Sequence, residues 1–396
     1  MREDFCYRMN LELRSGSMKR KGIALVMALF MCISQIVLGS ELPDVKAKGA
    51  LLMEVESGRV LFEKNGYEPL PMASTTKIMT CIVALENGNL DDIVTASKRA
   101  CCAPPVKLKL QIGEKQRLGD LLYSLMLESH NDTAVAIAEH VGGSVEHFCE
   151  MMTDKAREIG AQNATFKTPN GLDAEGHHAS AYDMAIIASY AVQNPEFVKI
   201  VTTELISIPT KEVPGSRRHD LQCKNRFLYS YTGANGMKTG FTNKAGHCFV
   251  GSANRDDMQL VGVALASGWG KAGKTRKYTD VINMMNYGFK NYEKVQVLSP
   301  SRSYINVPVT KAIVKSIDLA CDEEIVLPLT AVEKENLVLK KIVPPSVQAP
   351  IAEGDTVGEV QVLCGGTVLA SAPLTAKENI KKANVFDYIK NWIKNK

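Results

Sequence analysis

The sequence predicts an α/β (α+β) sandwich, in which strands from both ends of a long segment form one sheet and helices are inserted between them. Helical periodicity dominates from about residue 75 to 200, and a further helix is expected at 275–291. Strand-type sequences occur on both sides of the long helical region, at 49–55, 60–63, 246–252 and 259–266. Because helices do not alternate regularly with strands, this order argues against a doubly wound βαβ array.

Composition indicates a globular protein with more than one domain. The chain has 396 residues, of which 45% are hydrophobic and 23% are charged. The formal net charge of +4 is concentrated at the two ends, because residues 1–21 contribute +3 and residues 377–396 contribute +4. The remainder is close to −3, which argues against nucleic-acid binding.

The N-terminal residues are typical of an export signal. Basic residues at 19–21 precede an apolar run at 22–38, and Gly39 is a small residue at a possible cleavage point. Residues 1–39 are therefore expected to be a signal peptide, with Met18 as an alternative start. Of the eight cysteines outside the expected signal, Cys81, Cys149 and Cys248 lie in apolar periodic segments. Most of the cysteines are expected to be free thiols, and a disulfide is the open alternative. Neither C-x-x-C nor H-E-x-x-H occurs, so no metal or cofactor is expected.

Three short motifs carry the chemistry of a serine acyl-transfer site. They are Ser74-Thr75-Thr76-Lys77, Ser129-His130-Asn131 and Lys238-Thr239-Gly240. Together they supply a nucleophile beside an amine base, a second hydroxyl with an amide, and a cationic strand. S-x-x-K alone is a weak signal, because a chain of this length contains about one or two such strings by chance. All three motifs in this order are much more specific.

The first motif lies at the start of a buried helix. Apolar residues at 78–85 continue the helix until Asn87-Gly88 ends it, so Ser74 lies near the N-terminus. Lys77 then lies one turn later on the same face, within reach of the Ser74 hydroxyl. The alternative is that Ser74 only caps the helix. That alternative would be preferred if the other two motifs were absent.

The other two motifs lie between helices and on a strand. Ser129 to Asn131 separate helical segments at 118–127 and 134–141. Lys238 to Gly240 follow the glycine-rich segment 233–236, as an edge strand close to a ligand would. The alternative for Lys238 is an ordinary solvated surface lysine. A second S-x-N string at 252–254 lies in a predicted strand and is given no role.

The C-terminal part has a different pattern of hydrophobic and polar residues. Short alternating segments within 295–374, separated by Pro344-Pro345 and Gly365-Gly366, predict a small β-rich domain. In the last twenty residues the apolar side chains fall within an arc of roughly 160° on a helical wheel. These are Val385, Phe386, Tyr388, Ile389, Trp392 and Ile393. Such a helix suits a membrane interface, and a helix docked on a core is the alternative.

These differences in sequence pattern divide the chain into four parts. The expected boundaries are 1–39 for the signal peptide, 42–292 for the catalytic domain, 293–375 for the β-rich domain and 376–396 for the amphipathic helix.

One string fits a different function. Gly268 to Thr275 match the phosphate-binding pattern G-x-x-x-x-G-K-T, after a predicted strand and before a helix. The export signal argues against nucleotide binding, and no later strand ending in Asp is suited to hold magnesium. A surface loop rich in glycine and lysine is the preferred interpretation.

The motifs resemble the D-alanyl-D-alanine carboxypeptidases, which are low-molecular-mass penicillin-binding proteins of the serine peptidase type. The resemblance covers about Leu42 to Phe386, and it includes the segments Phe166–Asp173 and Asn286–Phe289. It implies a β-lactamase/transpeptidase-like catalytic domain, a β-rich stalk and a C-terminal anchor on the outer face of the cytoplasmic membrane. One departure is His130, where many relatives carry glycine. Its side chain is expected to narrow the cleft.

The expected reaction is release of the terminal D-alanine from peptidoglycan pentapeptides through an acyl-enzyme on Ser74, which penicillins would also acylate. Lys77, desolvated and near Lys238, would act as the base. The resemblance further implies the remaining roles. Ser129 would relay the proton, Asn131 would orient the substrate amide and Lys77, and the backbone N–H groups of Ser74 and Phe241 would bind the oxyanion. Lys238 and Thr239 would hold the terminal carboxylate with help from Arg226, and Gly240 is also expected to bind substrate. A β-lactamase of the same fold and a non-catalytic wall-binding protein are the alternatives. No E-x-x-L-N string of the kind that speeds deacylation is present.

Overall fold

The computed structural model describes residues 41–300 and 302–394, so the expected signal peptide lies outside the described residues. Its central element is a five-stranded antiparallel sheet with the strand order β2-β1-β9-β8-β7. The strands are β1 (Gly49–Glu54), β2 (Val60–Lys64), β7 (Ala234–Thr242), β8 (Gly246–Arg255) and β9 (Met258–Leu265). β1 pairs with β9, with Leu51 opposite Val263. The prediction of one sheet built from both ends of the segment is confirmed.

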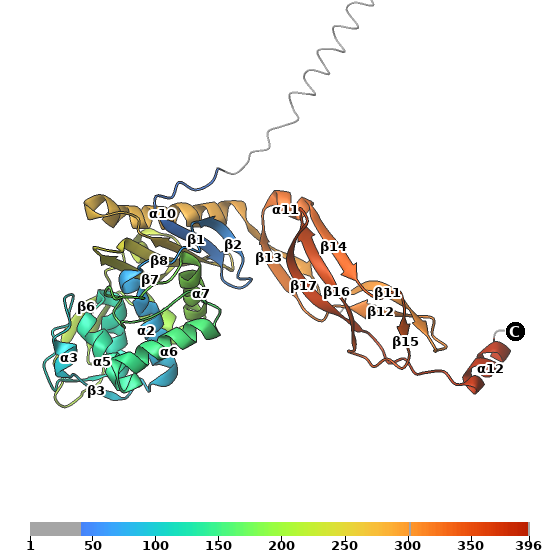
Figure 1. Ribbon diagram of the computed structural model, residues 1–396, viewed down its shortest axis with the longest axis horizontal. Helices are drawn as coiled ribbons and strands as arrows, with labels where there is room; N and C mark the ends of the chain where they lie inside the picture. Colours follow the sequence, from blue (N-terminus) through green and yellow to red (C-terminus); the bar gives the residue numbers. More distant parts are fainter. Residues whose placement is uncertain (1–40, 301, 395–396) are drawn as a thin grey trace, which may run out of the picture. The chain divides into compact units, whose positions relative to one another are not determined.

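Both faces of the sheet are covered, as the alternation of β1 requires. Ala50 and Leu52 belong to the hydrophobic cluster formed with α10 (Gly270–Asn291). Leu51 and Met53 belong to the larger cluster on the opposite face, which contains buried residues of most other helices of this part, whereas Phe227 packs in the α10 cluster. Figure 1 shows α10 along one side of the sheet and α2 (Lys77–Asn87), α5 (Asn131–Gly142) and α6 (Val145–Glu158) on the other. This two-sided packing holds the sheet edge β7 in place beside the helices.

The helices inserted between the strands match the expected order and have the following bounds. They are α2 (Lys77–Asn87), α3 (Lys98–Cys101), α4 (Leu118–Tyr123), α5 (Asn131–Gly142), α6 (Val145–Glu158), α7 (Ala181–Val192), α8 (Pro195–Thr202) and α9 (Phe227–Ser230). A 3-10 turn, η1 (Ala73–Thr76), precedes α2, and a π-helical turn, η2 (Ser124–Glu128), follows α4. Two small ribbons were not expected from the sequence: β3 (Ile93–Thr95) with β4 (Lys115–Arg117), and β5 (Leu205–Ile208) with β6 (His219–Gln222).

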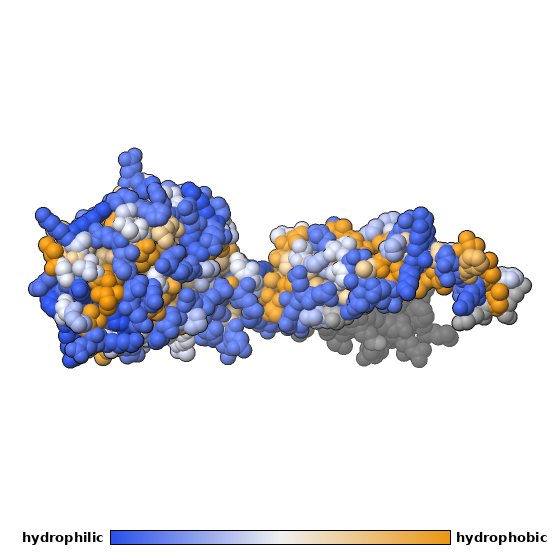
Figure 2. Space-filling view, turned by 90° about the horizontal axis from the view of Figure 1, so that it is seen from below, coloured by the Kyte–Doolittle hydropathy of each residue, from blue (hydrophilic) through white to orange (hydrophobic). Residues whose placement is uncertain are grey.

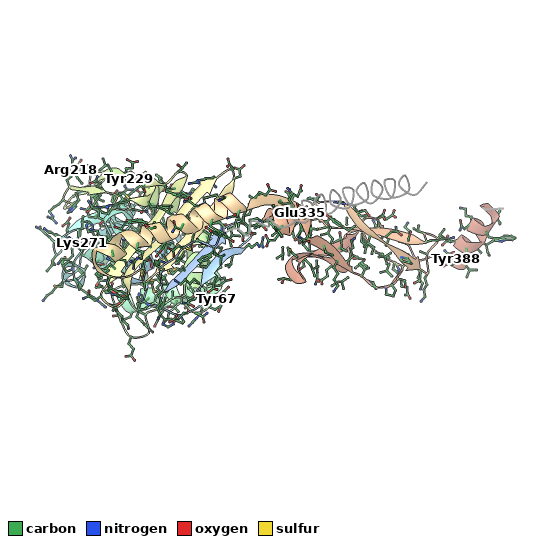
Figure 3. The ribbon with its side chains drawn as sticks, turned by 90° about the horizontal axis from the view of Figure 1, so that it is seen from above. Tyr67, Arg218, Tyr229, Lys271, Glu335 and Tyr388 are labelled. Carbon is green, nitrogen blue, oxygen red and sulfur yellow. The ribbon has the colours of Figure 1, made fainter. Side chains whose placement is uncertain are left out.

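α10 begins five residues before the predicted helix start, because its glycines permit close packing. A Cβ on Gly273 would lie 2.4 Å from the carbonyl carbon of Gly268, so only glycine lets the first turn fold back on the preceding chain. Lys271 is exposed at this end of α10 (Figure 3). Phosphate-binding loops of the pattern G-x-x-x-x-G-K-T belong to parallel βα units, whereas β9 pairs with antiparallel neighbours. The string at 268–275 therefore does not have the setting of a nucleotide site.

The β-rich part contains a six-stranded sheet with the order β14-β16-β17-β12-β11-β15, and β10 pairs with β13 beside it. The bounds are β10 (Glu293–Leu298), β11 (Ser303–Thr310), β12 (Ser316–Ala320), β13 (Ile325–Leu329), α11 (Ala331–Glu335), β14 (Leu337–Ile342), β15 (Val347–Gln348), β16 (Thr356–Cys364) and β17 (Thr367–Ala376). Leu319, Val360 and Leu374 are fully buried in a core of its own. The expected β-rich C-terminal domain is confirmed.

The last described element is α12 (Val385–Lys394), on which Tyr388 is labelled in Figure 3. Six of its hydrophobic side chains are 47% to 81% exposed: Val385, Phe386, Tyr388, Ile389, Trp392 and Ile393. Figure 2 shows hydrophobic residues at the surface of this helix. None of the helices within the described residues is both long and apolar enough to cross a bilayer.

Packing between α5 and α6 supports a direct stability test. Phe148 is completely buried, and a Cβ on Gly142 would lie 2.7 Å from its Cβ, so the two helices are in close contact. We expect Phe148→Ala to lower the free energy of unfolding by about 3 to 5 kcal/mol through lost burial and a new cavity. The matched control is His147→Ala, whose exposed side chain should change it by less than about 0.5 kcal/mol. Urea unfolding followed by circular dichroism measures both, and equal midpoints would contradict the packing described.

Candidate active site

Ser74 lies in a tight turn. Two glycines allow other segments of the chain to come close to this turn. Ala73, just before it, has a φ of +49°. A Cβ on Gly171 would lie 2.0 Å from the Ala73 carbonyl oxygen, and one on Gly240 would lie 2.9 Å from the Ser74 nitrogen. Larger residues at either position would therefore push the 166–173 segment or the β7 edge away from Ser74. This is the physical reason for the glycine in the K-T-G motif.

Lys77 is buried completely and its amine has three polar neighbours. Nζ lies 3.0 Å from Ser74 Oγ, 2.8 Å from Asn131 Oδ1 and 2.7 Å from the Asn170 carbonyl oxygen. The Asn131 amide orientation is fixed, because its Nδ2 donates to the carbonyls of Pro104 and Pro105 at 3.1 and 3.0 Å. Two of the three neighbours of Nζ are therefore pure acceptors.

These contacts define how the amine would be oriented in its neutral form. A neutral lysine amine has two N–H bonds and one lone pair. In the neutral form the two N–H bonds would point to the acceptor oxygens of Asn131 and Asn170, which leaves the lone pair on the side of Ser74 Oγ. Ser74 Oγ itself also lies 3.3 Å from the Asn170 carbonyl oxygen. Burial, and then the positive charge of Lys238, hold the pKa of Lys77 well below its usual range. Lys77 Nζ and Ser74 Oγ are thus neighbours, 3.0 Å apart, and the role of Lys77 as base stays a prediction.

Ser129 occupies a strained backbone conformation. It follows the π-helical turn η2 and has a φ of +69°, which is uncommon for a residue other than glycine. Strained residues of this kind cluster at functional sites. Ser129 lines the same cavity as Ser74.

The side chain of His130 does not lie in the cleft, contrary to the expectation from the sequence. Its side chain is buried, and Nδ1 lies 2.9 Å from Ser124 Oγ beneath η2. Burial lowers the pKa of His130 to about 4, so the ring is neutral near pH 7. The described residues that line the cavity do not include His130. The expectation that it narrows the cleft is wrong, because the ring turns into the helical layer.

The third motif lies on β7, at the edge of the sheet. Lys238 is 3% exposed and donates to the Thr239 carbonyl at 3.2 Å. Burial, and then the positive charge of Lys277, lower the pKa of Lys238 to about 7. A buried lysine with no carboxylate beside it in the described part of the chain is suited to bind an anion. The surface-lysine alternative for Lys238 is therefore wrong.

The three motifs converge on one cavity of about 340 Å³. Its lining includes Ser74, Ser129, Lys238, Thr239, Gly240 and Phe241. Asn131 and Lys77 lie beneath it through the contacts described above. Arg226 is not part of this lining; it lines an adjacent cavity of about 380 Å³ together with Thr239 and Lys277.

Two features of the site were missed by sequence reasoning. Lys277 is 7% exposed and lines both cavities, and burial lowers its pKa to about 8. Its only signal in the sequence was a lysine-rich helix start, which surface helices share. The second feature is the Asn170 carbonyl, a backbone group that every residue carries. No sequence pattern could have indicated its role.

Comparison with known proteins agrees with this site. A sequence model described as D-alanyl-D-alanine carboxypeptidase matches residues 37–268, and one described as penicillin-binding protein 5, C-terminal domain, matches residues 292–382. D-alanyl-D-alanine carboxypeptidase DacF of Bacillus subtilis is 33% identical over 359 residues, covering 88% of this chain and 90% of that protein. DacC of Escherichia coli is 29% identical over 367 residues, covering 89% of each chain.

Solved structures give the same result. Penicillin-binding protein 5 of Haemophilus influenzae is similar with a TM-score of 0.74 and 26% identity, covering 87% of this chain and all of that one. DacD of Francisella tularensis has a TM-score of 0.71 and 25% identity, covering 88% of this chain and 97% of that one. The chain therefore belongs to the D-alanyl-D-alanine carboxypeptidase family of serine peptidases.

Proposed function

We propose that this D-alanyl-D-alanine carboxypeptidase forms an acyl-enzyme on Ser74, with Lys77 as general base. The observation that supports this assignment most strongly is the contact set of Lys77 Nζ, in which two acceptor-only oxygens leave the lone pair for Ser74. The substrate is a peptidoglycan stem peptide ending in D-Ala-D-Ala. β-Lactams acylate the same serine because their strained amide occupies the same position.

Acylation begins when Lys77 takes the Ser74 proton and the oxygen attacks the carbonyl between the two D-alanines. Backbone N–H groups of Ser74 and Phe241 bind the resulting oxyanion, which the close approach of Gly240 to the Ser74 nitrogen supports. Ser129 relays the proton to the nitrogen of the leaving D-alanine. Water then hydrolyses the ester and releases the shortened peptide.

The terminal carboxylate of the substrate is held by Lys238 and Thr239. Lys277 lines the same cavity, and Arg226 lines the adjacent cavity together with Thr239. The buried Asn225 Nδ2, also in the main lining, has no partner in the part of the chain that the structure describes and can donate to the peptide. Asn131 acts on Lys77, because its own amide is already bonded to the Pro104 and Pro105 carbonyls.

A β-lactamase is less well supported. Fast hydrolysis of a penicilloyl ester needs a base for the attacking water. Among the described residues lining the cavity, the one carboxylate is Glu128, which accepts from the Gln222 N–H at 2.9 Å and lies 3.4 Å from Lys224 Nζ. Glu128 is therefore engaged, so the described lining offers no free carboxylate to activate water, and a long-lived penicilloyl enzyme is expected.

The cellular setting is also part of the proposal. Residues 1–39 direct export, and the exposed apolar side of α12 attaches the mature protein to the outer face of the cytoplasmic membrane as a peripheral protein. In this arrangement 42–292 form the catalytic domain, 293–375 the β-rich domain and 376–396 the anchor.

The nucleophile assignment is tested by substitution. We expect Ser74→Ala to lose labelling by a fluorescent penicillin and to release D-alanine from a pentapeptide at least about 1,000-fold more slowly, because no other group replaces the attacking oxygen. Thr75→Ala in the same turn is the matched control and should keep both activities. Strong labelling of Ser74→Ala would disprove the assignment, and rapid penicillin turnover by the unmodified enzyme would favour the β-lactamase.

Lys77 and Lys238 predict opposite limbs of the pH profile. Below the lowered pKa of Lys77 the base is protonated, so kcat/KM should fall as pH falls. Above the pKa of about 7 of Lys238 its charge is lost in the free enzyme, so kcat/KM for a peptide carboxylate should fall as pH rises. Lys238→Arg keeps its charge and should remove the basic limb. D-Alanine release measured from about pH 5 to about pH 10 tests this, and an unchanged basic limb in the variant would contradict it.

Membrane attachment is tested with vesicles. We expect Ile389→Glu to reduce co-sedimentation of the protein with phosphatidylcholine vesicles by about tenfold, because it places a charge on the apolar side of α12. Lys390→Gln, one residue further, is the matched control and should bind as the unchanged protein does. Equal binding of all three proteins would exclude α12 as the anchor.

A further inference from the structure

His177 is a buried histidine near the site to which the mechanism assigns no role. It lies 101 positions after Thr76 in the chain, and the segment before it contains Asn170. The side chain is 6% exposed, and its ring packs edge-to-face on Phe166 with the ring centroids 6.0 Å apart. The described lining of the main cavity does not include it. A role in contacting substrate is therefore not indicated.

Both ring nitrogens of His177 are engaged. Nδ1 lies 3.0 Å from the Lys167 backbone nitrogen, and Nε2 lies 3.0 Å from Thr76 Oγ1. A backbone N–H can only donate, so Nδ1 accepts and the ring proton is on Nε2, which donates to the Thr76 hydroxyl. Burial lowers the pKa of His177 to about 4, which agrees with a neutral ring.

These two bonds connect the segments that supply the catalytic contacts. Thr76 stands between Ser74 and Lys77 in the chain, and Lys167 is three residues before Asn170, whose carbonyl accepts from Lys77. Two further side-chain links reach this segment. Thr80 Oγ1 on α2 donates to the Pro169 carbonyl at 2.6 Å, and Ser74 Oγ lies 3.3 Å from the Asn170 carbonyl oxygen. The position of the Asn170 oxygen relative to Lys77 thus depends on a small number of bonds.

We infer that His177 is a positioning residue, which as its Nε2–H tautomer ties the 167–170 segment to the Ser74 turn and so places the Asn170 carbonyl that orients the Lys77 lone pair. The inference rests on the proposed role of Lys77 as base. Its consequence is kinetic. Loss of the bridge slows the acylation step, whereas binding of the ligand in the cavity is unchanged.

The test compares three His177 and His178 variants by the kinetics of penicillin acylation, which separate the dissociation constant of the first complex from the acylation rate constant. His177→Leu should lower the rate constant by at least about tenfold, with the dissociation constant changed less than about twofold. His177→Gln should restore the rate to within about threefold, because its carboxamide offers both an acceptor and a donor. His178→Leu is the neighbouring control and should match the unchanged enzyme.

A second variant covers the case in which His177→Leu does not fold. Thr76→Val removes the hydroxyl partner only, and it should also lower the acylation rate constant. In a folded double variant the two losses should be smaller than additive, because both substitutions break one bridge. A normal rate constant in folded Thr76→Val, a Gln variant as slow as the Leu variant, or additive losses would each overturn the inference.

Failure of this inference differs from failure of the proposed function. If Ser74→Ala still labels with penicillin, the nucleophile and its base are wrongly assigned, whatever the His177 variants do. If Ser74→Ala is inactive while His177→Leu acylates at the normal rate, only the role of His177 is refuted.

Discussion

The site depends on a lysine amine that is kept out of water and surrounded by acceptors. Exposed to solvent, Lys77 would be an ammonium ion and could not take a proton. Complete burial and the nearby charge of Lys238 disfavour that form, and the oxygens of Asn131 and Asn170 fix the direction of the remaining lone pair. Since these oxygens come from α5 and from the 166–173 segment, the chemistry requires that two distant parts of the chain pack against α2.

Glycine and strained backbone positions make that packing possible. Gly171 and Gly240 let two segments come within contact distance of the Ser74 turn, where a Cβ would collide with backbone atoms. Ser129 and Ala73 hold positive φ angles at the same place. Such conformations cost free energy, and the buried sheet and helices around them supply the rigidity that maintains them. The rigid packing of the surrounding sheet and helices therefore explains how the site keeps backbone conformations that are unfavourable on their own.

The cavity also carries more positive charge than its own carboxylates balance. Lys238 and Lys277 are buried with depressed pKa values, and Arg226 stands in the neighbouring cavity. A peptide carboxylate entering this region would restore the charged form of these amines.

Much of this was determined by the sequence itself. Alternating and helical periodicities are local properties, so the strands β1, β8 and β9, the helices α2, α6 and α7 and the motif residues Ser74, Lys77, Ser129, Asn131 and Lys238 could be identified without a structure. The inward turn of His130, the early start of α10, the burial of Lys277 and the use of the Asn170 carbonyl were decided only by the tertiary structure. Each of these four features depends on which segments pack together in space. The sequence around a backbone oxygen or a helical lysine does not indicate which distant residues will contact it.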